Sequence, residues 1–421
     1  MPKNLLFAVV CIIVFSSLTG CYDAKEITEW GYVYSIGMEK GITDKLRVTV
    51  QVPSMKGGDN GGGTAKSHGE IENIVIDCPS FYSGVNMINS FLSRQLNYMH
   101  TKYMVFSEEL AREGIDTYIN GFIRSRQIRR QISVIVSKGS ASKFLEKNIL
   151  TVSSSLSKKQ QNLLTRQEDT GFFSGATYGD MLNDVKTYYG QPIAILAAVN
   201  DDNRFKEGEG KGQTTFKSSG DYYAGELMRK GASNVEFFGT AVFDGGRMVG
   251  ELNGDETRAL LMVRDEFNRG YFAVKDPKKQ DTTVTLDVRR QKKPQISVGF
   301  KENNPTVNLK IFLEGDIVAI QSTVDYENEE LKPILETEFK NHIKEHLDKT
   351  IKKCQNLNSD VFKFGSYAAM HFLTISEWEE YNWLKRFKNV KINTEIEFRI
   401  RRTGTMLKSS EIISSEGQKG E

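Results

Sequence analysis

Residues 102–136, KYMVFSEELAREGIDTYINGFIRSRQIRRQISVIV, hold two short apolar stretches on either side of a more polar segment. The stretches at 102–106 and 132–136 are rich in β-branched and aromatic residues, which is typical of strands. Residues 108–123 between them are predicted to be helical. A strand, a helix and a second strand in this order indicate a sheet with helices packed against it.

The same alternation continues in both directions along the chain. Strands are predicted near residues 30–39, 46–52, 71–77, 192–199, 237–243, 247–252, 283–288, 295–300, 306–313 and 390–401. Helices are predicted near residues 80–96, 139–147, 153–170, 178–188, 256–267, 359–372 and 377–387. The longest predicted helix covers about residues 331–353, where an apolar residue recurs every four positions and Pro333 stands near the start.

The composition fits a globular protein that buries real cores. The chain has 421 residues, 39% of them hydrophobic and 26% charged, so two or three domains are expected. We predict the α+β class, with two or three packed domains, each a mixed β-sheet with helices against it. The predicted divisions are a lipoprotein signal peptide at 1–20, an N-terminal α+β domain at 22–200 with a glycine-rich loop at 56–69, a polar linker or surface excursion at 201–232, a C-terminal α+β domain at 233–404 and a loose tail at 405–421.

Residues 1–21 have the pattern of a bacterial lipoprotein signal. A lysine precedes an apolar run over residues 5–15, and small residues follow. This order is typical of a secretory signal peptide, and the run is too short to span a bilayer. The sequence Leu-Thr-Gly-Cys at 18–21 matches the lipobox, so we expect cleavage after Gly20 and conversion of Cys21 to an N-palmitoyl, S-diacylglycerol cysteine. A plain signal peptide with an incidental cysteine and an uncleaved short anchor are the alternatives.

The remaining cysteines suggest no redox or metal chemistry. Cys11 would leave with the signal peptide, and Cys78 and Cys354 lie 276 positions apart in different predicted regions. They could pair, since the exported side of a membrane permits disulfides. We expect instead two separate buried thiols, because the chain has no Cys-x-x-Cys spacing.

The charge balance excludes some partners. The formal net charge is +2, and removal of the single lysine in residues 1–20 would lower it by one. A nearly neutral chain is not expected to bind nucleic acid, or anionic lipid by charge alone. The basic run at 124–130 could be a docking patch, but a solvated helix end before a buried strand is favoured. Trp378 and Trp383, five positions apart on a predicted helix, are expected in the core.

Candidate catalytic motifs are weak. His342, Glu345 and His346 fit the pattern H-x-x-E-H, in which two histidines hold zinc and the glutamate acts as base. Only three positions are fixed, and both histidines flank the apolar stripe, so a solvated helix shoulder is favoured. Residues 63–67 (GTAKS) lack two glycines of a phosphate loop and precede a predicted strand. We therefore expect no catalytic residue, no metal site and no cofactor.

Several segments, in order along the chain, are characteristic of one family. They are GCYDAKEITEWGYVYSIGMEK at 20–40, HTK at 100–102, EELAREGI at 108–115, VSKGSA at 136–141, GTAVF at 239–243, VGEL at 249–252, DVFKFG at 360–365 and RRTG at 401–404. Over roughly residues 18–404 the chain resembles the Ger(x)C lipoproteins, the C subunits of bacterial spore germinant receptors. Tyr22 stands where this family usually has tryptophan, and Lys363 where glycine is common.

The resemblance implies a lipid-anchored accessory subunit on the outer face of the spore inner membrane. It would partner two membrane-embedded receptor subunits and act in assembly and signal coupling, without chemistry, nucleic acid or a small-molecule substrate of its own. A solute-binding lipoprotein is the alternative from another class, and an exported hydrolase is the third. A deep polar cleft with converging side chains would favour the binding protein, whereas broad exposed surface patches would favour the receptor subunit.

Overall fold

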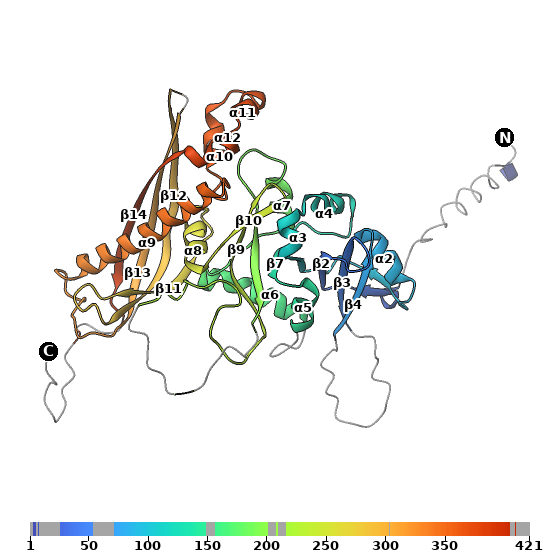
Figure 1. The fold of residues 1–421 in the computed structure, drawn as a ribbon, viewed down its shortest axis with the longest axis horizontal. Coiled ribbons are helices and arrows are strands. Elements are labelled where there is room, and N and C mark those ends of the chain that lie inside the picture. Colours follow the sequence, from blue (N-terminus) through green and yellow to red (C-terminus); the bar gives the residue numbers. More distant parts are fainter. Residues whose placement is uncertain are drawn as a thin grey trace.

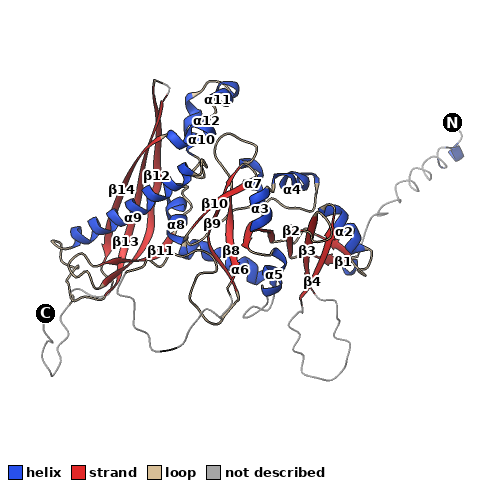
Figure 2. Cartoon of the chain, in the orientation of Figure 1, coloured by secondary structure: helices blue, strands red, loops and turns tan. Residues whose placement is uncertain are grey.

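The computed structural model describes residues 3–5, 7, 26–53, 71–148, 156–200, 208, 216–302, 304–404 and 409. Cys21 and the glycine-rich loop at 56–69 lie outside the described residues, as do nearly all of residues 1–20 and 405–421. The molecule is built around two β-sheets that lie side by side (Figure 1). Helices cover both sheets, which confirms the predicted α+β class (Figure 2).

The first sheet has eight strands in the order β10-β9-β8-β7-β6-β2-β3-β4. Its four central strands, from β8 to β2, are parallel, and the strands at both ends pair antiparallel. The strands are β2 (Ser35–Lys40), β3 (Leu46–Pro53), β4 (Ile71–Cys78), β6 (Tyr103–Ser107), β7 (Ser133–Lys138), β8 (Ile193–Val199), β9 (Val235–Asp244) and β10 (Arg247–Leu252). A separate parallel pair joins β1 (Trp30–Tyr32) to β5 (Gln95–Asn97).

Successive residues of the central strands point to opposite faces, and each face has its own core. Met104 and Phe106 pack with the helices α2 (Phe81–Asn89), α3 (Glu108–Glu113), α4 (Asp116–Gly121) and α7 (Tyr178–Asp184). Tyr103 and Val105 pack on the other face with α5 (Ala141–Lys147) and α6 (Leu156–Thr170). The single helix predicted at 108–123 is divided because Gly114, with φ of 135°, ends α3 in a conformation that favours glycine.

The predicted boundary at 201–232 does not coincide with an end of the first sheet. Strand β9 pairs with β8, so residues assigned to the C-terminal region complete the N-terminal sheet. Most of β9 is buried, as expected for a strand between two neighbours. Its apolar sequence predicted a strand correctly but contained no signal of which sheet it joins.

The second sheet has four strands in the order β11-β12-β13-β14. They are β11 (Arg269–Lys275), β12 (Thr283–Lys301), β13 (Asn304–Ile320) and β14 (Lys391–Arg402), with β14 parallel to β13. The strands predicted at 283–288 and 295–300 are one long strand, because the pairing of β12 with β13 continues through register shifts between Arg290 and Gln295. Strand β11 was not predicted.

Helices α8 (Gly254–Val263) and α9 (Lys332–Asn356) cover one face of the second sheet. The predicted stripe of α9 is buried from Leu335 to Ile351. Three short helices follow, α10 (Phe364–Ala368), α11 (Ile375–Tyr381) and α12 (Trp383–Arg386). Within the described ranges, no helix combines the length and apolar character needed to cross a membrane.

Candidate functional site

The segment Asp360–Gly365 lies where the two sheets meet. It follows α9 and leads into α10, and Asp360 is fully buried. The Asp360 carboxylate accepts hydrogen bonds from the backbone N–H of Gly365 (2.8 Å), the backbone N–H of Phe364 (3.2 Å) and the indole Nε1–H of Trp383 (2.8 Å). One buried acid therefore fixes the start of α10 and the position of α12.

Burial raises the pKa of Asp360 to about 6, although the hydrogen bonds that its carboxylate accepts favour the charged form. Removing a carboxylate from water disfavours its ionisation, and here this effect exceeds the opposing effect of the hydrogen bonds. No cation within this set of contacts neutralises the group. The arrangement is that of a structural acid that joins elements.

The same segment is bonded to the first sheet and its connections. The backbone N–H of Gln191 donates to the Asp360 carbonyl at 2.9 Å, and Lys363 forms an ion pair with Asp184 at 2.8 Å. Gly190 is required by the close approach, because a Cβ there would lie 3.0 Å from the same carbonyl. Segments on both sides of the 201–232 region therefore meet at Asp360–Gly365.

Lys363 adopts a left-handed conformation with φ of 62°. Such a conformation costs little for glycine and more for residues with a Cβ. Lys363, where the family resemblance implies a glycine, thus occupies a position at which glycine is favoured. Its ion pair with Asp184 provides a compensating contact.

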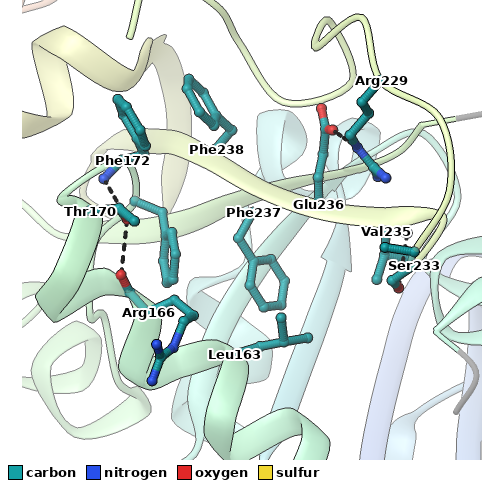
Figure 3. Close-up of a pocket in the computed structure, with 12 residues that line it drawn as sticks. Leu163, Arg166, Thr170, Phe172, Arg229, Ser233, Val235, Glu236, Phe237 and Phe238 are labelled. Carbon is teal, nitrogen blue, oxygen red and sulfur yellow. Dashed lines mark hydrogen bonds and ion pairs between the residues drawn. The ribbon is translucent and has the colours of Figure 1, made fainter. Parts of the chain in front are cut away.

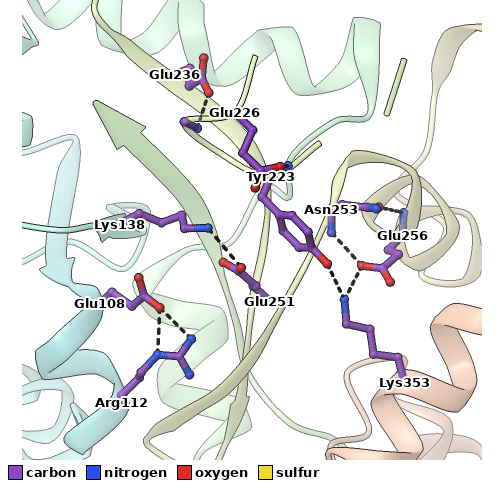
Figure 4. Close-up of polar contacts among 11 residues, drawn as sticks. Glu108, Arg112, Lys138, Tyr223, Glu226, Glu236, Glu251, Asn253, Glu256 and Lys353 are labelled. Carbon is purple, nitrogen blue, oxygen red and sulfur yellow. Dashed lines mark hydrogen bonds and ion pairs between the residues drawn. The ribbon is translucent and has the colours of Figure 1, made fainter. Parts of the chain in front are cut away.

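A network of charged residues forms a second connection between the two halves (Figure 4). Lys353 of α9 donates to Glu256 of α8 at 2.7 Å and to the Tyr223 hydroxyl at 3.1 Å. Lys138 at the end of β7 pairs with Glu251 of β10 at 3.2 Å. Both ammonium groups lie 5.3 Å from the Tyr223 ring centroid, so this ring lies close to one lysine from each half.

The histidine pair of α9 faces α8. The ring centroids of His342 and His346 are 4.6 Å apart. Both rings line a small pocket together with Asp255, Arg258 and Phe272. Burial lowers the pKa of His342 to about 4, and the neighbouring His346 adds to this effect. The prediction of a solvated helix shoulder is therefore wrong for these half-buried rings, which pack between two helices.

The features of a zinc peptidase are not assembled around this pair. Glu345 is exposed and forms an ion pair with Lys349, one turn further along α9. Among the described residues, no group of three or more His, Cys, Asp or Glu side chains is placed to hold a metal ion. The pair contributes two half-buried imidazoles without a third ligand from the described part of the chain.

An apolar cavity of about 320 Å³ lies between α6 and β9 (Figure 3). Its walls are mainly aromatic and aliphatic side chains, and Arg166 and Arg229 lie at its margin with their partners Asp169 and Glu236. The apolar lining residues are Leu163, Phe172, Phe173, Ala232, Val235, Phe237 and Phe238. Such walls do not provide the converging polar groups that a nutrient site requires.

A polar crevice of about 640 Å³ lies at the carboxyl ends of β2, β6 and β7. This is where open α/β sheets bind ligands. Its charged groups are already paired: Lys40 contacts Glu109 at 2.9 Å, Arg47 contacts Asp77 at 2.7 Å, and Glu39 accepts the Ala141 N–H at 2.7 Å. Paired charges in an open crevice favour a structural role.

Three other sequence predictions are confirmed. Cys78 and Cys354 are both buried and free, and burial raises the pKa of both thiols. Trp378 and Trp383 are buried core residues. All the arginines of the basic run at 124–130 are exposed and precede the buried strand β7.

Sequence reasoning missed the roles of Asp360 and Tyr223. Asp360 is the one acid of the DVFKFG segment, and its apolar neighbours were a usable signal of burial. Tyr223 had no such signal, because it lies in the polar region at 201–232 and meets Lys138 and Lys353 only in the folded chain.

The two halves of the chain match two models of one family. Residues 23–199 match the N-terminal domain of spore germination proteins, and residues 238–404 match the C-terminal domain described as spore germination B3/GerAC-like. Together these ranges cover both sheets and their junction, and β10 with most of β9, which complete the eight-stranded sheet, fall in the second range. The chain therefore belongs to the Ger(x)C family, the C subunits of spore germinant receptors.

Individual relatives align over nearly their whole length. Spore germination protein KC of Bacillus subtilis (strain 168) is 22% identical, with 96% of this chain and 97% of the relative covered. Spore germination protein B3 of the same organism is 19% identical, with 94% and 97% covered. The crystal structure of the GerBC protein has a similar fold, with a TM-score of 0.50 at 15% identity and coverage of 87% of this chain and 96% of that chain.

Proposed function

We propose that the protein is a lipid-anchored accessory subunit of a nutrient germinant receptor, required for assembly and signal coupling in spore germination. Cys21 would carry the lipid after cleavage following Gly20, as the lipobox at 18–21 predicts. The anchor would hold the folded part on the outer face of the spore inner membrane. Two membrane-embedded receptor subunits would be its partners.

The observation that carries the proposal is the ordered match of both family models along one chain. A protein that matched only one of the two family domains would lack the junction between them. Here residues 184–191 and 360–365, one segment from each matched range, bond to each other. This arrangement fits a subunit that works as one unit between partners.

A non-catalytic role agrees with the chemistry of the polar groups where the two halves meet. The Asp360 carboxylate accepts hydrogen bonds from three N–H groups. The Lys353 ammonium donates to Glu256 and Tyr223. The histidine pair lacks a third ligand among the described residues. Groups that already form hydrogen bonds within the protein are poorly placed to bind or activate a substrate.

Co-purification from spore membranes tests the proposal. A tagged full-length chain, expressed from its own locus, should retain polytopic receptor subunits after detergent extraction. A tagged exported lipoprotein of another family, at the same level, controls for incidental capture. Recovery of a solute transporter in place of receptor subunits would favour the binding-protein alternative.

A further inference from the structure

Three large apolar side chains are exposed together at one end of the second half. Met370, Leu373 and Ile375 have exposed fractions of 77%, 94% and 70%. They lie between α10 and the first residue of α11, beside the tip of the β12–β13 hairpin (Figure 1). Single exposed apolar residues are ordinary on soluble proteins, but here three fall within six positions, and we call these three residues the patch.

The residues between Met370 and Leu373 pack against an aromatic cluster. The Phe300 ring, near the end of β12, contacts the rings of His371 and Phe372 at centroid distances of 5.3 and 5.7 Å. Phe372 also contacts Trp378, which is buried, at 5.2 Å. His371 and Phe372, which lie between Met370 and Leu373, are therefore anchored in an aromatic cluster.

Hydrogen bonds fix the same turn. Thr374 caps α11 by accepting the Glu377 N–H, and the Glu377 carboxylate accepts the backbone N–H groups of Thr374 and Leu373. A capping box of this kind stabilises the first turn of a helix. The backbone that carries Leu373 and Ile375 is thus held in place, which lowers the entropy cost of ordering this segment on binding.

The charges beside the patch restrict what it can bind. Glu377, Glu379 and Glu380 are exposed on α11, directly after the patch. Lys363, seven positions before Met370, is paired with Asp184, and the exposed Lys301 and Glu302 at the hairpin tip carry opposite charges. Lys385 and Arg386 follow α11 beyond Asn382, and the Arg386 guanidinium lies over the Tyr381 ring. The flank of the patch is acidic.

An acidic flank disfavours two of the possible occupants. An anionic membrane surface would repel the three carboxylates. A symmetric contact with a second copy would bring the same acidic flanks together, because a two-fold interface uses the same surface on both subunits. The remaining occupant is a different protein with positive charge around an apolar pocket.

We propose that Met370, Leu373 and Ile375 form a docking surface for another subunit of the receptor complex, one that offers an apolar pocket rimmed by basic side chains. This inference rests on the proposed function, because it takes the receptor as the source of the partner. The apolar side chains supply the contact area, and the α11 carboxylates supply orientation.

The test compares two double variants of the full-length chain. Leu373→Ser with Ile375→Ser removes most of the patch, and Ile27→Ser with Ile42→Ser changes two side chains of similar exposure elsewhere. We expect the patch variant to reduce co-purification of membrane-embedded receptor subunits at least tenfold, while the control variant retains the wild-type level. A second patch variant, Glu379→Lys with Glu380→Lys, leaves the apolar residues in place and should also weaken co-purification.

The outcomes separate the alternatives. Undiminished co-purification by both patch variants, with a positive wild type, overturns the docking surface and leaves the proposed function standing. A wild type that retains no receptor subunit overturns both. Binding of unlipidated wild-type protein to phosphatidylglycerol-containing vesicles, lost on changing Leu373 and Ile375, assigns the patch to lipid and overturns the inference. Self-association in sedimentation velocity that depends on the same residues overturns it in favour of a second copy.

Discussion

The buried acid at the junction predicts a specific dependence of stability on pH. The folded-state pKa of Asp360 is about 6, above the ordinary value of 3.8. Between these two values the folded state binds more protons than the unfolded state, so the free energy of unfolding falls as the pH rises. A difference of this size corresponds to about 3 kcal/mol of lost stability once the pH is above 6.

Asp360→Asn removes the stability loss that comes from ionising Asp360, but it also loses one hydrogen bond, which costs less. The amide oxygen can accept from Gly365 and Trp383 as one carboxylate oxygen does, while the amide nitrogen faces the Phe364 N–H. Losing that 3.2 Å hydrogen bond costs about 1 kcal/mol. The variant should therefore be about 2 kcal/mol more stable than wild type at pH 7.5 and about 1 kcal/mol less stable at pH 4.

Urea unfolding of residues 22–421, followed by tryptophan fluorescence from pH 4 to 7.5, measures this difference. The comparison of variant with wild type at each pH removes the titration of all other groups. Asp169→Asn is the matched control, since Asp169 is exposed, and it should change stability by less than about 0.5 kcal/mol. A difference between wild type and Asp360→Asn that does not vary with pH would refute the reasoning.

Three further predictions concern chemistry, ligands and packing. Purified residues 22–421 should contain no stoichiometric zinc by metal analysis, because the two imidazoles lack a third ligand; zinc that disappears in His346→Ala would contradict this. Calorimetry with amino acids, sugars and nucleosides should detect no tight binding, and a dissociation constant near micromolar, about −8 kcal/mol, would promote the binding-protein alternative. Phe339→Ala should destabilise the second half by about 3–5 kcal/mol in urea unfolding, since the ring is fully buried between Phe272 and Phe398; a loss below about 1 kcal/mol would show that the α9 stripe is not a core.

Most helices and strands could be predicted, because the pattern of apolar and polar residues that favours each one lies within a short stretch of sequence. The apolar stripe of α9, buried from Leu335 to Ile351, is one example. Strand β11 was missed because its buried residues, such as Phe272 and Val274, alternate within only seven positions and polar residues flank them. The predicted ends of helices were wrong where a single residue, such as Gly114, ends the helix.

The junction could not be predicted, because it depends on contacts between distant segments. Gln191 and Asp360 are bonded but lie far apart in the sequence, and nothing local to either residue indicates the other. The half-burial of His342 has the same origin, since the residues that cover it belong to α8 and β11. The family resemblance identified the segment at 360–365 but not what its aspartate does.

The lipid anchor is the central claim, and removing it from an otherwise mature chain tests it most directly. Residues 22–421 would be exported in the sporulating cell behind an ordinary cleavable signal, without Cys21, so that no lipid is attached. One lipid chain gives only marginal membrane binding and two hold stably, while the nearly neutral mature chain provides little electrostatic attraction to replace them. We predict that this form folds with an unchanged melting temperature, leaves the membrane fraction of spores and fails to support nutrient germination. A form that fractionates fully with membranes and supports germination would contradict the account.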